Sequence, residues 1–250
     1  MSHLEEKSVP EKVAKKIVFA SGKGGVGKST LAVSMARRLY SKGFKVLIID
    51  CDIGLRSLDI MLDLSGKMVY DWSDVIFNRC SAKDAMVKGE SPVLLAAPNS
   101  DVEVTPQDMQ KLVKCYEKAF DYIIIDAPAG IGKGFNLALS MADEALLVST
   151  PDVVCARSSG VAAQKIFDAG IEPRLVINKF NKVEVIKGNL LNIDSIIDQT
   201  GAMLIGVVPE EKQLAHFVLK GKEPDDGLKS IKAIDRIINR FNGENIKLVL

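Results

Sequence analysis

Short apolar runs recur along the whole chain, and each has the length of a strand. Most are rich in Val, Ile and Leu and are apolar at nearly every position, which is typical of strands covered on both faces, as in a parallel sheet. The runs lie at Lys16 to Ala20, Lys45 to Ile49, Pro92 to Ala96, Tyr122 to Ile125, Ala145 to Ser149, Leu175 to Ile177 and Leu204 to Val208.

Between these runs the apolar residues recur at helical spacing, at Leu31 to Lys42, Pro106 to Ala119, Ser158 to Ala169, Asn189 to Gln199 and Leu228 to Phe241. The repeated order of strand and helix predicts an α/β fold, a doubly wound, mainly parallel sheet with helices on both faces in three layers. Because no Pro/Gly/Ser-rich linker or internal repeat divides the chain, we expect one domain at residues 16–241. A flexible segment at 1–15 precedes it, and a short tail at 242–250 follows it.

The last helical pattern, Leu228 to Phe241, is amphipathic. Its isoleucines and Phe241 form one stripe, and basic residues, among them Lys229, Lys232, Arg236 and Arg240, lie opposite. Such a helix can lie on an anionic membrane. Most amphipathic helices of globular domains instead pack the apolar stripe on the core, and we expect this here. The following Ile246 to Leu250 can extend an edge strand or contact a partner, and the sequence favours neither.

A glycine-rich segment, GKGGVGKST, follows the first apolar run at Gly22 to Thr30. It fills the phosphate-loop pattern G-x-x-x-x-G-K-[ST], in the order of strand, loop and helix that the motif requires. Lys28 is expected to contact the β- and γ-phosphates, and the Ser29 hydroxyl to bind magnesium. Lys23 is not required by the pattern. The predicted nucleotide-binding residues of this loop are Gly22, Gly24, Gly25, Val26, Gly27, Lys28, Ser29 and Thr30.

Carboxylates follow two further apolar runs, Asp50 and Asp52 after the second run and Asp126 after Tyr122 to Ile125. Residues two apart in an extended segment point to the same side, so both Asp50 and Asp52 can approach the γ-phosphate. There one carboxylate can orient water and the other can hold magnesium through its hydration shell. Asp126 has the position of a Walker B aspartate. The candidate magnesium residues are Ser29, Asp50, Asp52 and Asp126.

Composition restricts the partners and the cellular location. The formal net charge of +1 offers no broad basic surface, so nucleic acid is not expected as a partner. The four cysteines lie far apart and never form C-x-x-C, which argues against a disulfide framework or a metal site within one subunit. Neither a signal-peptide pattern nor a long apolar stretch is present, and we expect a cytoplasmic protein.

Four motifs together resemble the MinD branch of the MinD/ParA ATPases. They are GKGGVGKST, DCDIGLRSLD at Asp50 to Asp59, DAPAGI at Asp126 to Ile131 and GVVPEE at Gly206 to Glu211. The resemblance covers roughly Lys16 to Phe241. It implies hydrolysis of ATP to ADP and phosphate with Mg²⁺, in a dimer that forms with ATP and encloses both nucleotides.

The resemblance also implies residue roles. Lys23 crosses the dimer interface to the partner's nucleotide, and Lys28 holds the phosphates. Asp52 positions the attacking water, and Asp126 belongs to the magnesium shell. Asn178 and Pro209 flank the adenine. With Lys23, Lys28 and Asp52 as the catalytic set, the expected function is a switch for spatial regulation, such as selection of the cell-division site.

The chain departs from the MinD pattern in two places. Ala127 replaces the usual serine, and Gly132 and Lys133 stand where an acidic residue is usual. The terminal basic amphipathic helix of MinD proteins is replaced by NGENIKLVL at Asn242 to Leu250. A MinE- or MinC-like regulator is the partner implied, and peripheral contact with the inner face of the membrane stays open.

Two alternative functions use the same fold. A metallocentre-assembly or metal-carrier ATPase would have to bridge its metal with single cysteines such as Cys115 or Cys155. A ParA-like DNA-partitioning ATPase would need basic patches on the dimer.

Overall fold

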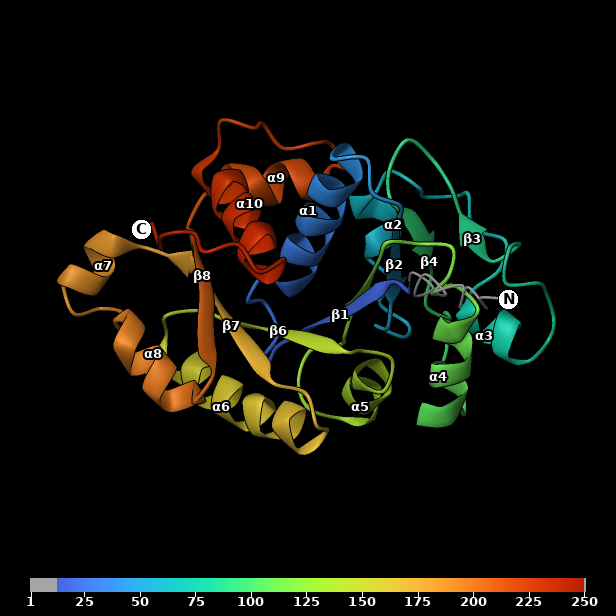
Figure 1. The fold of residues 1–250 in the computed structure, drawn as a ribbon, viewed down its shortest axis with the longest axis horizontal. Coiled ribbons are helices and arrows are strands. Elements are labelled where there is room, and N and C mark those ends of the chain that lie inside the picture. The colour runs from blue at the N-terminus through green and yellow to red at the C-terminus, as the bar shows by residue number, and fades with distance from the viewer. Residues whose placement is uncertain (1–12, 250) are drawn as a thin grey trace, which may run out of the picture.

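The computed structural model describes residues 13–249, which form one eight-stranded sheet (Figure 1). The strand order is β3-β4-β2-β5-β1-β6-β7-β8, and every neighbouring pair is parallel except β3 with β4. The strands are β1 (Lys15–Ala20), β2 (Val46–Asp50), β3 (Met86–Val87), β4 (Val93–Leu95), β5 (Tyr122–Asp126), β6 (Glu144–Ser149), β7 (Pro173–Phe180) and β8 (Met203–Pro209).

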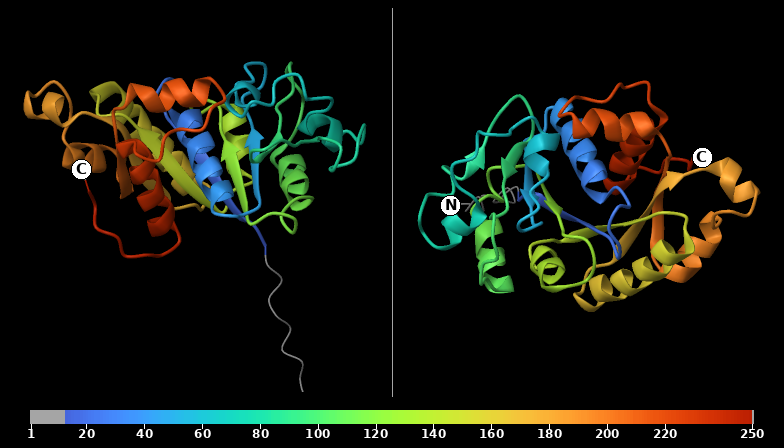
Figure 2. Two further views of the ribbon diagram at one scale, coloured as in Figure 1. Left: turned by 90° about the horizontal axis from the view of Figure 1, so that it is seen from above. Right: turned by 180° about the vertical axis from the view of Figure 1, so that it is seen from behind.

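Helices cover both faces of the sheet, as the views from above and behind also show (Figure 2). On one face lie α1 (Lys28–Ser41), α2 (Leu58–Met61), α9 (Lys212–Leu219) and α10 (Lys229–Phe241). On the other lie α3 (Trp72–Ile76), α4 (Pro106–Lys114), α5 (Lys133–Leu139), α6 (Val153–Asp168) and α8 (Ile193–Thr200), while the short α7 (Lys182–Ile186) extends from the end of β7. This is the predicted three-layer α/β fold.

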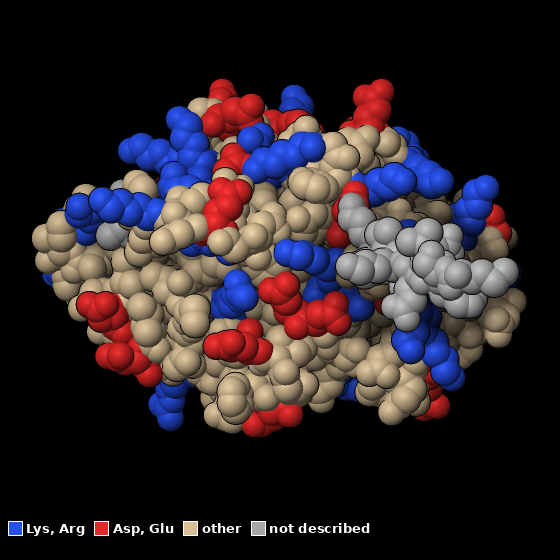
Figure 3. Space-filling view, viewed as in Figure 1, with Lys and Arg blue, Asp and Glu red and all other residues tan. Residues whose placement is uncertain are grey.

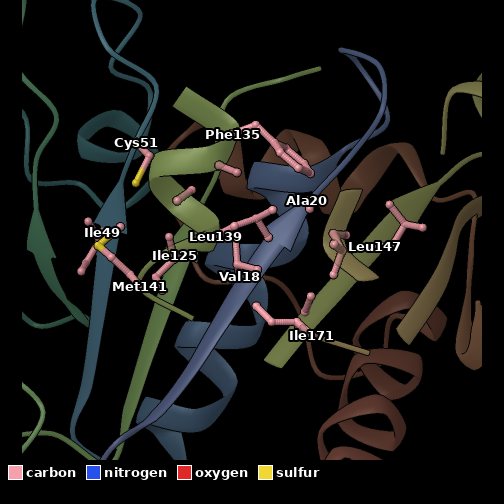
Figure 4. Packing of buried hydrophobic residues seen from close by; sticks show 14 of the residues in the cluster. Val18, Ala20, Ile49, Cys51, Ile125, Phe135, Leu139, Met141, Leu147 and Ile171 are labelled. Carbon is pink, nitrogen blue, oxygen red and sulfur yellow. The ribbon is translucent and has the colours of Figure 1, made fainter. Parts of the chain in front are cut away.

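The core consists of two apolar clusters, one on each face of the sheet. Figure 4 shows one of them, where Phe135 and Leu139 of α5 pack over Val18 and Ala20 of β1. The strand interiors are buried on both sides, since all five residues of β2 and all five of β5 are buried. This double burial explains why their sequences are continuously apolar instead of alternating.

The apolar stripe of α10 is buried against the sheet and α1, as expected from its pattern. Of the two alternatives for Ile246 to Leu250, the edge strand is wrong for the described residues, because no strand forms between Ile246 and Val249. Instead the tail folds back over α10, where Arg240 donates hydrogen bonds to the carbonyl oxygens of Ile246 and Lys247 at 2.9 and 2.6 Å.

The expected segment 1–15 lies outside the described residues apart from 13–15. Lys15 begins β1, and Ala14 just before it is buried in the core, so the ordered domain starts before residue 16. Among residues 13–249, no helix combines the length and the apolar character needed to cross a membrane.

Candidate nucleotide-binding site

The site lies at the carboxyl ends of β1, β2 and β5, which are neighbours in the middle of the sheet. Asp50 and Asp126 are register partners at the last position of β2 and β5, so their carboxylates stand side by side. Phe19 of β1 is the partner of Asp126 on the other side, and the phosphate loop begins three residues later at Gly22. The edge at which parallel sheets bind ligands therefore carries all the chemistry predicted from the sequence.

The phosphate loop has the conformation that glycine allows. Gly25 and Gly27 have φ angles of 80° and 88°, in the left-handed region that side chains disfavour. A Cβ atom at Gly27 would lie 2.4 Å from the amide nitrogen of Asn178, so no larger residue fits. Helix α1 begins at Lys28 with neither a side-chain cap nor an acidic residue in its first turn. Its first backbone N–H groups are thus available to an anion, which is the cradle that a phosphate requires.

Lys28 is the buried cation of the site. Its Nζ atom lies 2.6 Å from Asp126 Oδ1, and their side chains are 7% and 1% exposed. Lys28 Nζ also donates to Ser29 Oγ at 3.2 Å. The loop lysine, the candidate magnesium hydroxyl and the Walker B-type carboxylate therefore meet at one point.

The two carboxylates after β2 differ in environment. Asp50 is 2% exposed, and burial, with the adjacent Asp126 carboxylate adding to it, raises the pKa of Asp50 to about 7. Asp52 is half-buried, and burial also raises its pKa, although Lys28 opposes the shift. Asp50 Oδ1 accepts a hydrogen bond from the Asp52 backbone N–H at 2.9 Å, which holds the turn between them. Asp50 is thus the inner, buried group and Asp52 the more exposed one.

The side chain of Trp72 holds the backbone of this turn by a hydrogen bond. Trp72 begins α3, is 1% exposed and donates from Nε1 to the carbonyl oxygen of Asp50 at 2.9 Å. Trp72 is therefore a core residue. Tyr70 lies two residues before the helix and is 37% exposed.

The donor set fits magnesium held jointly with phosphate. Among residues 13–249, no three His, Cys, Asp or Glu side chains form a cluster that could hold a metal ion by themselves. Mg²⁺ keeps several waters and is usually bound through one or two protein ligands and substrate phosphates. Ser29, Asp50, Asp52 and Asp126 lie where they could supply such ligands or orient the waters.

A cavity of about 270 Å³ lies beside the loop and contains both residues expected near the adenine. Asn178 and Pro209 line it together with Gly27, Thr30 and Leu214. Asn178 is buried and donates from Nδ2 to the carbonyl oxygen of Val26 at 2.8 Å, so it also holds the loop in place. The mixture of apolar walls and an amide is suited to a purine base.

A second cavity, of about 330 Å³, opens on the other side of the loop around Lys23, Gly24 and Gly25. Lys23 is exposed, and within the described part of the chain its ammonium group forms no hydrogen bond or ion pair. Lys179 separates the two cavities, because its Nζ donates to the carbonyl oxygen of Gly25 at 2.7 Å and its side chain lines both.

The far wall of the Lys23 cavity includes Thr150, Asp152 and Cys155. No motif of the sequence points to Thr150 or Asp152. Asp152 caps α6 by accepting from the Cys155 N–H at 2.8 Å and also accepts from the Thr150 hydroxyl at 2.6 Å. Burial would raise the pKa of Asp152, but these hydrogen bonds together lower it. Only the strand order places Thr150 and Asp152 here, since they follow β6, the other neighbour of β1.

The small-residue segment after Asp126 contacts the loop directly. The Ala127 N–H donates to the Phe19 carbonyl oxygen at 3.1 Å, and the Gly130 N–H donates to that of Ser21 at 3.2 Å. These two bonds connect the small-residue segment to both ends of the turn that leads from β1 into the phosphate loop. A shift of either segment must therefore be felt by the other.

Comparison with known proteins agrees with this geometry. The ParA family, described as an NUBPL iron-transfer P-loop NTPase, matches residues 12–169. The septum site-determining protein MinD of Bacillus subtilis is 35% identical over 93% of this chain and 90% of its own length. The protein of the same name from Helicobacter pylori is 36% identical over 93% and 92%.

Solved structures show the same similarity. MinD in the MinC:MinD cell division complex of Aquifex aeolicus has a TM-score of 0.85 at 37% identity, covering 95% of this chain and 99% of that chain. MinD complexed with Mg-ADP from Pyrococcus horikoshii has a TM-score of 0.81 at 23% identity over 92% and 96%, which shows a common fold.

Proposed function

Because the chain belongs to the MinD family of ParA-type P-loop ATPases, we propose that it is a switch that dimerises with Mg-ATP and separates after hydrolysis. The observation that carries this proposal is Lys23. Lys23 is exposed, and its ammonium group forms no hydrogen bond or ion pair within residues 13–249. A cation at the mouth of the phosphate cradle is available to a nucleotide bound by a second copy of the chain.

The residues of the site divide the chemistry. Lys28 and the N–H groups of the loop bind the phosphates. The Lys28 ammonium group then contacts the γ-phosphate in place of Asp126. Ser29, Asp50, Asp52 and Asp126 would hold Mg²⁺ together with the phosphates, and the ion would supply charge neutralisation there. Asp52, half-buried at the open side, orients the attacking water. Asn178 and Pro209 hold the base.

Lys23 completes the catalytic set from the opposite protomer. Phosphoryl transfer needs positioning and charge more than covalent chemistry, so a cation supplied across an interface couples turnover to dimerisation. Hydrolysis then removes the γ-phosphate that attracts Lys23, and the dimer loosens. This is how a bound nucleotide is converted into a change of assembly state.

The task of the switch is spatial regulation, of which selection of the division site is the form named for its relatives. The Aquifex aeolicus MinD structure contains MinC, and a MinC-like protein is therefore the partner proposed here, with a MinE-like regulator as a further one. The proposed location is the cytoplasm, with peripheral contact at the inner face of the membrane.

The experiment is light scattering of the purified chain with Mg-ATP and with Mg-ADP. The parent should be dimeric with ATP and monomeric with ADP. Lys23→Ala should stay monomeric with ATP while its ADP affinity is unchanged, whereas Lys28→Ala should lose binding of both nucleotides. Lys83→Ala, at an exposed lysine between α3 and β3, is the matched control. ATP-dependent dimers of Lys23→Ala equal to those of the parent would refute the role across the interface.

A further inference from the structure

A groove lies at the C-terminal end of the fold, outside both cavities of the phosphate loop. Its volume is about 550 Å³, and it runs between the start of α7, the end of β8 and the outer face of α10. We call it the basic groove, and we define it by Lys182, Val183, Pro209, Lys229, Lys232 and Arg236. In Figure 3, Lys and Arg side chains gather over this part of the molecule, at the upper left.

The four cations of the basic groove form no ion pairs within the described part of the chain, and the nearby Glu211 interacts only with the charge of Lys229. Among residues 13–249, no ion pair involves Lys182, Lys229, Lys232 or Arg236. Other basic residues nearby do have carboxylate partners, since Arg38 and Lys42 lie 2.9 and 3.2 Å from the Asp235 carboxylate. Glu210 is the carboxylate on the wall, and it accepts a hydrogen bond from Asn181 at 3.3 Å. The groove therefore carries a net positive charge.

The surface between the cations is apolar. Phe180 and Pro209 line the floor, and Val183 and Val249 line the sides with exposed fractions of 58% and 51%. Val249 reaches this position because Arg240 ties the tail down over α10 and also donates to the carbonyl oxygen of Ile205 at 2.7 Å. Exposed apolar side chains inside a ring of cations favour a ligand that has both acidic and apolar groups.

We propose that the basic groove docks an extended acidic segment of a partner protein, with its carboxylates on Lys232, Arg236 and Lys182 and an apolar side chain between Val183 and Val249. The concave shape favours an inserted chain over a bilayer, which needs a flat or convex contact. The apolar floor favours a peptide over a nucleic acid, whose phosphates would meet Phe180 and Pro209 without a polar contact.

The groove is continuous with the nucleotide site through one segment. Pro209 and Glu210 line both the base cavity and the basic groove. The next residue, Glu211, accepts hydrogen bonds from the backbone N–H groups of Lys229 and Ser230 at 3.2 and 2.7 Å and so caps α10. Displacement of this segment by a peptide changes the wall against which a base packs. Docking and nucleotide binding are therefore linked, and this part of the inference rests on the proposed nucleotide site.

The test uses a fluorescein-labelled peptide of alternating glutamate and leucine, titrated with the full chain and followed by fluorescence anisotropy. Lys232→Glu/Arg236→Glu should weaken binding about tenfold or more, since it replaces two attractive charges by two repulsive ones. Lys83→Glu/Lys88→Glu, at two exposed lysines on the other side of the fold, should bind as the parent does. Equal affinity of the parent and the groove variant would overturn the proposal.

Two competing ligands complete the design. Vesicles of anionic phosphatidylglycerol and a short DNA duplex are offered to the same variants. The proposal would also be overturned if the parent bound either of these instead of the peptide and the groove variant did not. Linkage is tested with fluorescent ADP. Saturating peptide should change the affinity of the chain for ADP by the same factor by which saturating ADP changes its affinity for the peptide. Unaltered ADP affinity on saturation with peptide would refute the linkage. Peptide binding by Lys23→Ala separates this inference from the dimer proposal, because the groove does not contain Lys23.

Discussion

Two lysines of the phosphate loop occupy opposite environments, although they are separated by only four residues. Lys28 is buried and lies 2.6 Å from Asp126, whereas Lys23 is exposed and forms no ion pair within residues 13–249. Removing an ammonium group from water is costly unless it is paired, so Lys28 depends on the site that surrounds it. Lys23 keeps its hydration and is free to act outside its own chain.

The groups around the two lysines differ as well. Near Lys28 stand two inner carboxylates, Asp50 and Asp126, against one cation, so that end of the loop is electrostatically incomplete. Near Lys23 stands Asp152, whose carboxylate is already engaged by Thr150 and Cys155. The Lys28 end of the loop therefore needs a further cation and a ligand from solution. The Lys23 end instead presents a cation that such a ligand can contact.

The largest effect is expected from Lys28→Ala. It leaves Asp126 buried without its cation, which costs about 3 to 5 kcal/mol of the free energy of unfolding, and it abolishes nucleotide binding. Urea denaturation and ADP titration measure the two losses separately. The double variant Lys28→Ala/Asp126→Ala should recover much of the stability and none of the binding. Equal stability of Lys28→Ala and Lys23→Ala would contradict the contrast between the two lysines.

A smaller, pH-dependent effect is expected from Asp50→Asn. The carboxyl ionises near pH 3.8 in the unfolded chain and near 7 in the folded chain, so folding takes up a proton between these values. Stability is therefore lost as the pH rises through this window, by on the order of 4 kcal/mol once the pH exceeds 7. Without nucleotide, Asp50→Asn should be more stable than the parent at pH 8, and its advantage should shrink at pH 5.

Denaturation of both proteins across that pH range is the measurement. Asp198→Asn, at an exposed carboxyl on α8, should show no such trend. A constant difference between Asp50→Asn and the parent at pH 5 and pH 8 would mean that Asp50 is not the strained carboxylate of the site.

The smallest effect is expected from Asn178→Ala. The change removes a wall of the base cavity and the hydrogen bond to the Val26 carbonyl oxygen, so nucleotide affinity should fall about tenfold, or about 1.4 kcal/mol. Calorimetric titration with ADP measures it. Asn189→Ala, at an exposed amide bonded to Glu184, is the control. If Asn178→Ala reduced the affinity for pyrophosphate as much as that for ADP, Asn178 would act only through the loop and not through the base cavity.

The fold could be predicted from the sequence because each buried strand is written as a continuous apolar run, and all seven expected runs are strands. The two-residue β3 was missed, since Met86 and Val87 are too few to form a pattern. Helix α6 begins five residues before its predicted start, because Asp152 caps it and its first turn exposes Val153 and Val154 instead of burying them.

The phosphate loop could be predicted because its chemistry is contiguous in the sequence. Thr150, Asp152 and Lys179 could not, because each joins the site through the strand order and not through a motif. The same holds for the basic groove, where α7, α10 and the tail meet only after folding. Arg240, which holds that tail, was expected merely as one of the basic residues on the outer face of α10.

Complementation between two inactive variants tests most directly whether Lys23 acts across the interface. Lys23→Ala lacks the donated cation, and Asp52→Ala lacks the group that orients water, so each alone should hydrolyse ATP at a small fraction of the parental rate. In a mixed dimer, the Lys23→Ala protomer keeps Asp52 and receives Lys23 from its partner. An equimolar mixture should therefore hydrolyse ATP faster than the sum of the two variants measured alone. Rates that merely add would contradict the exchange and place Lys23 in its own site.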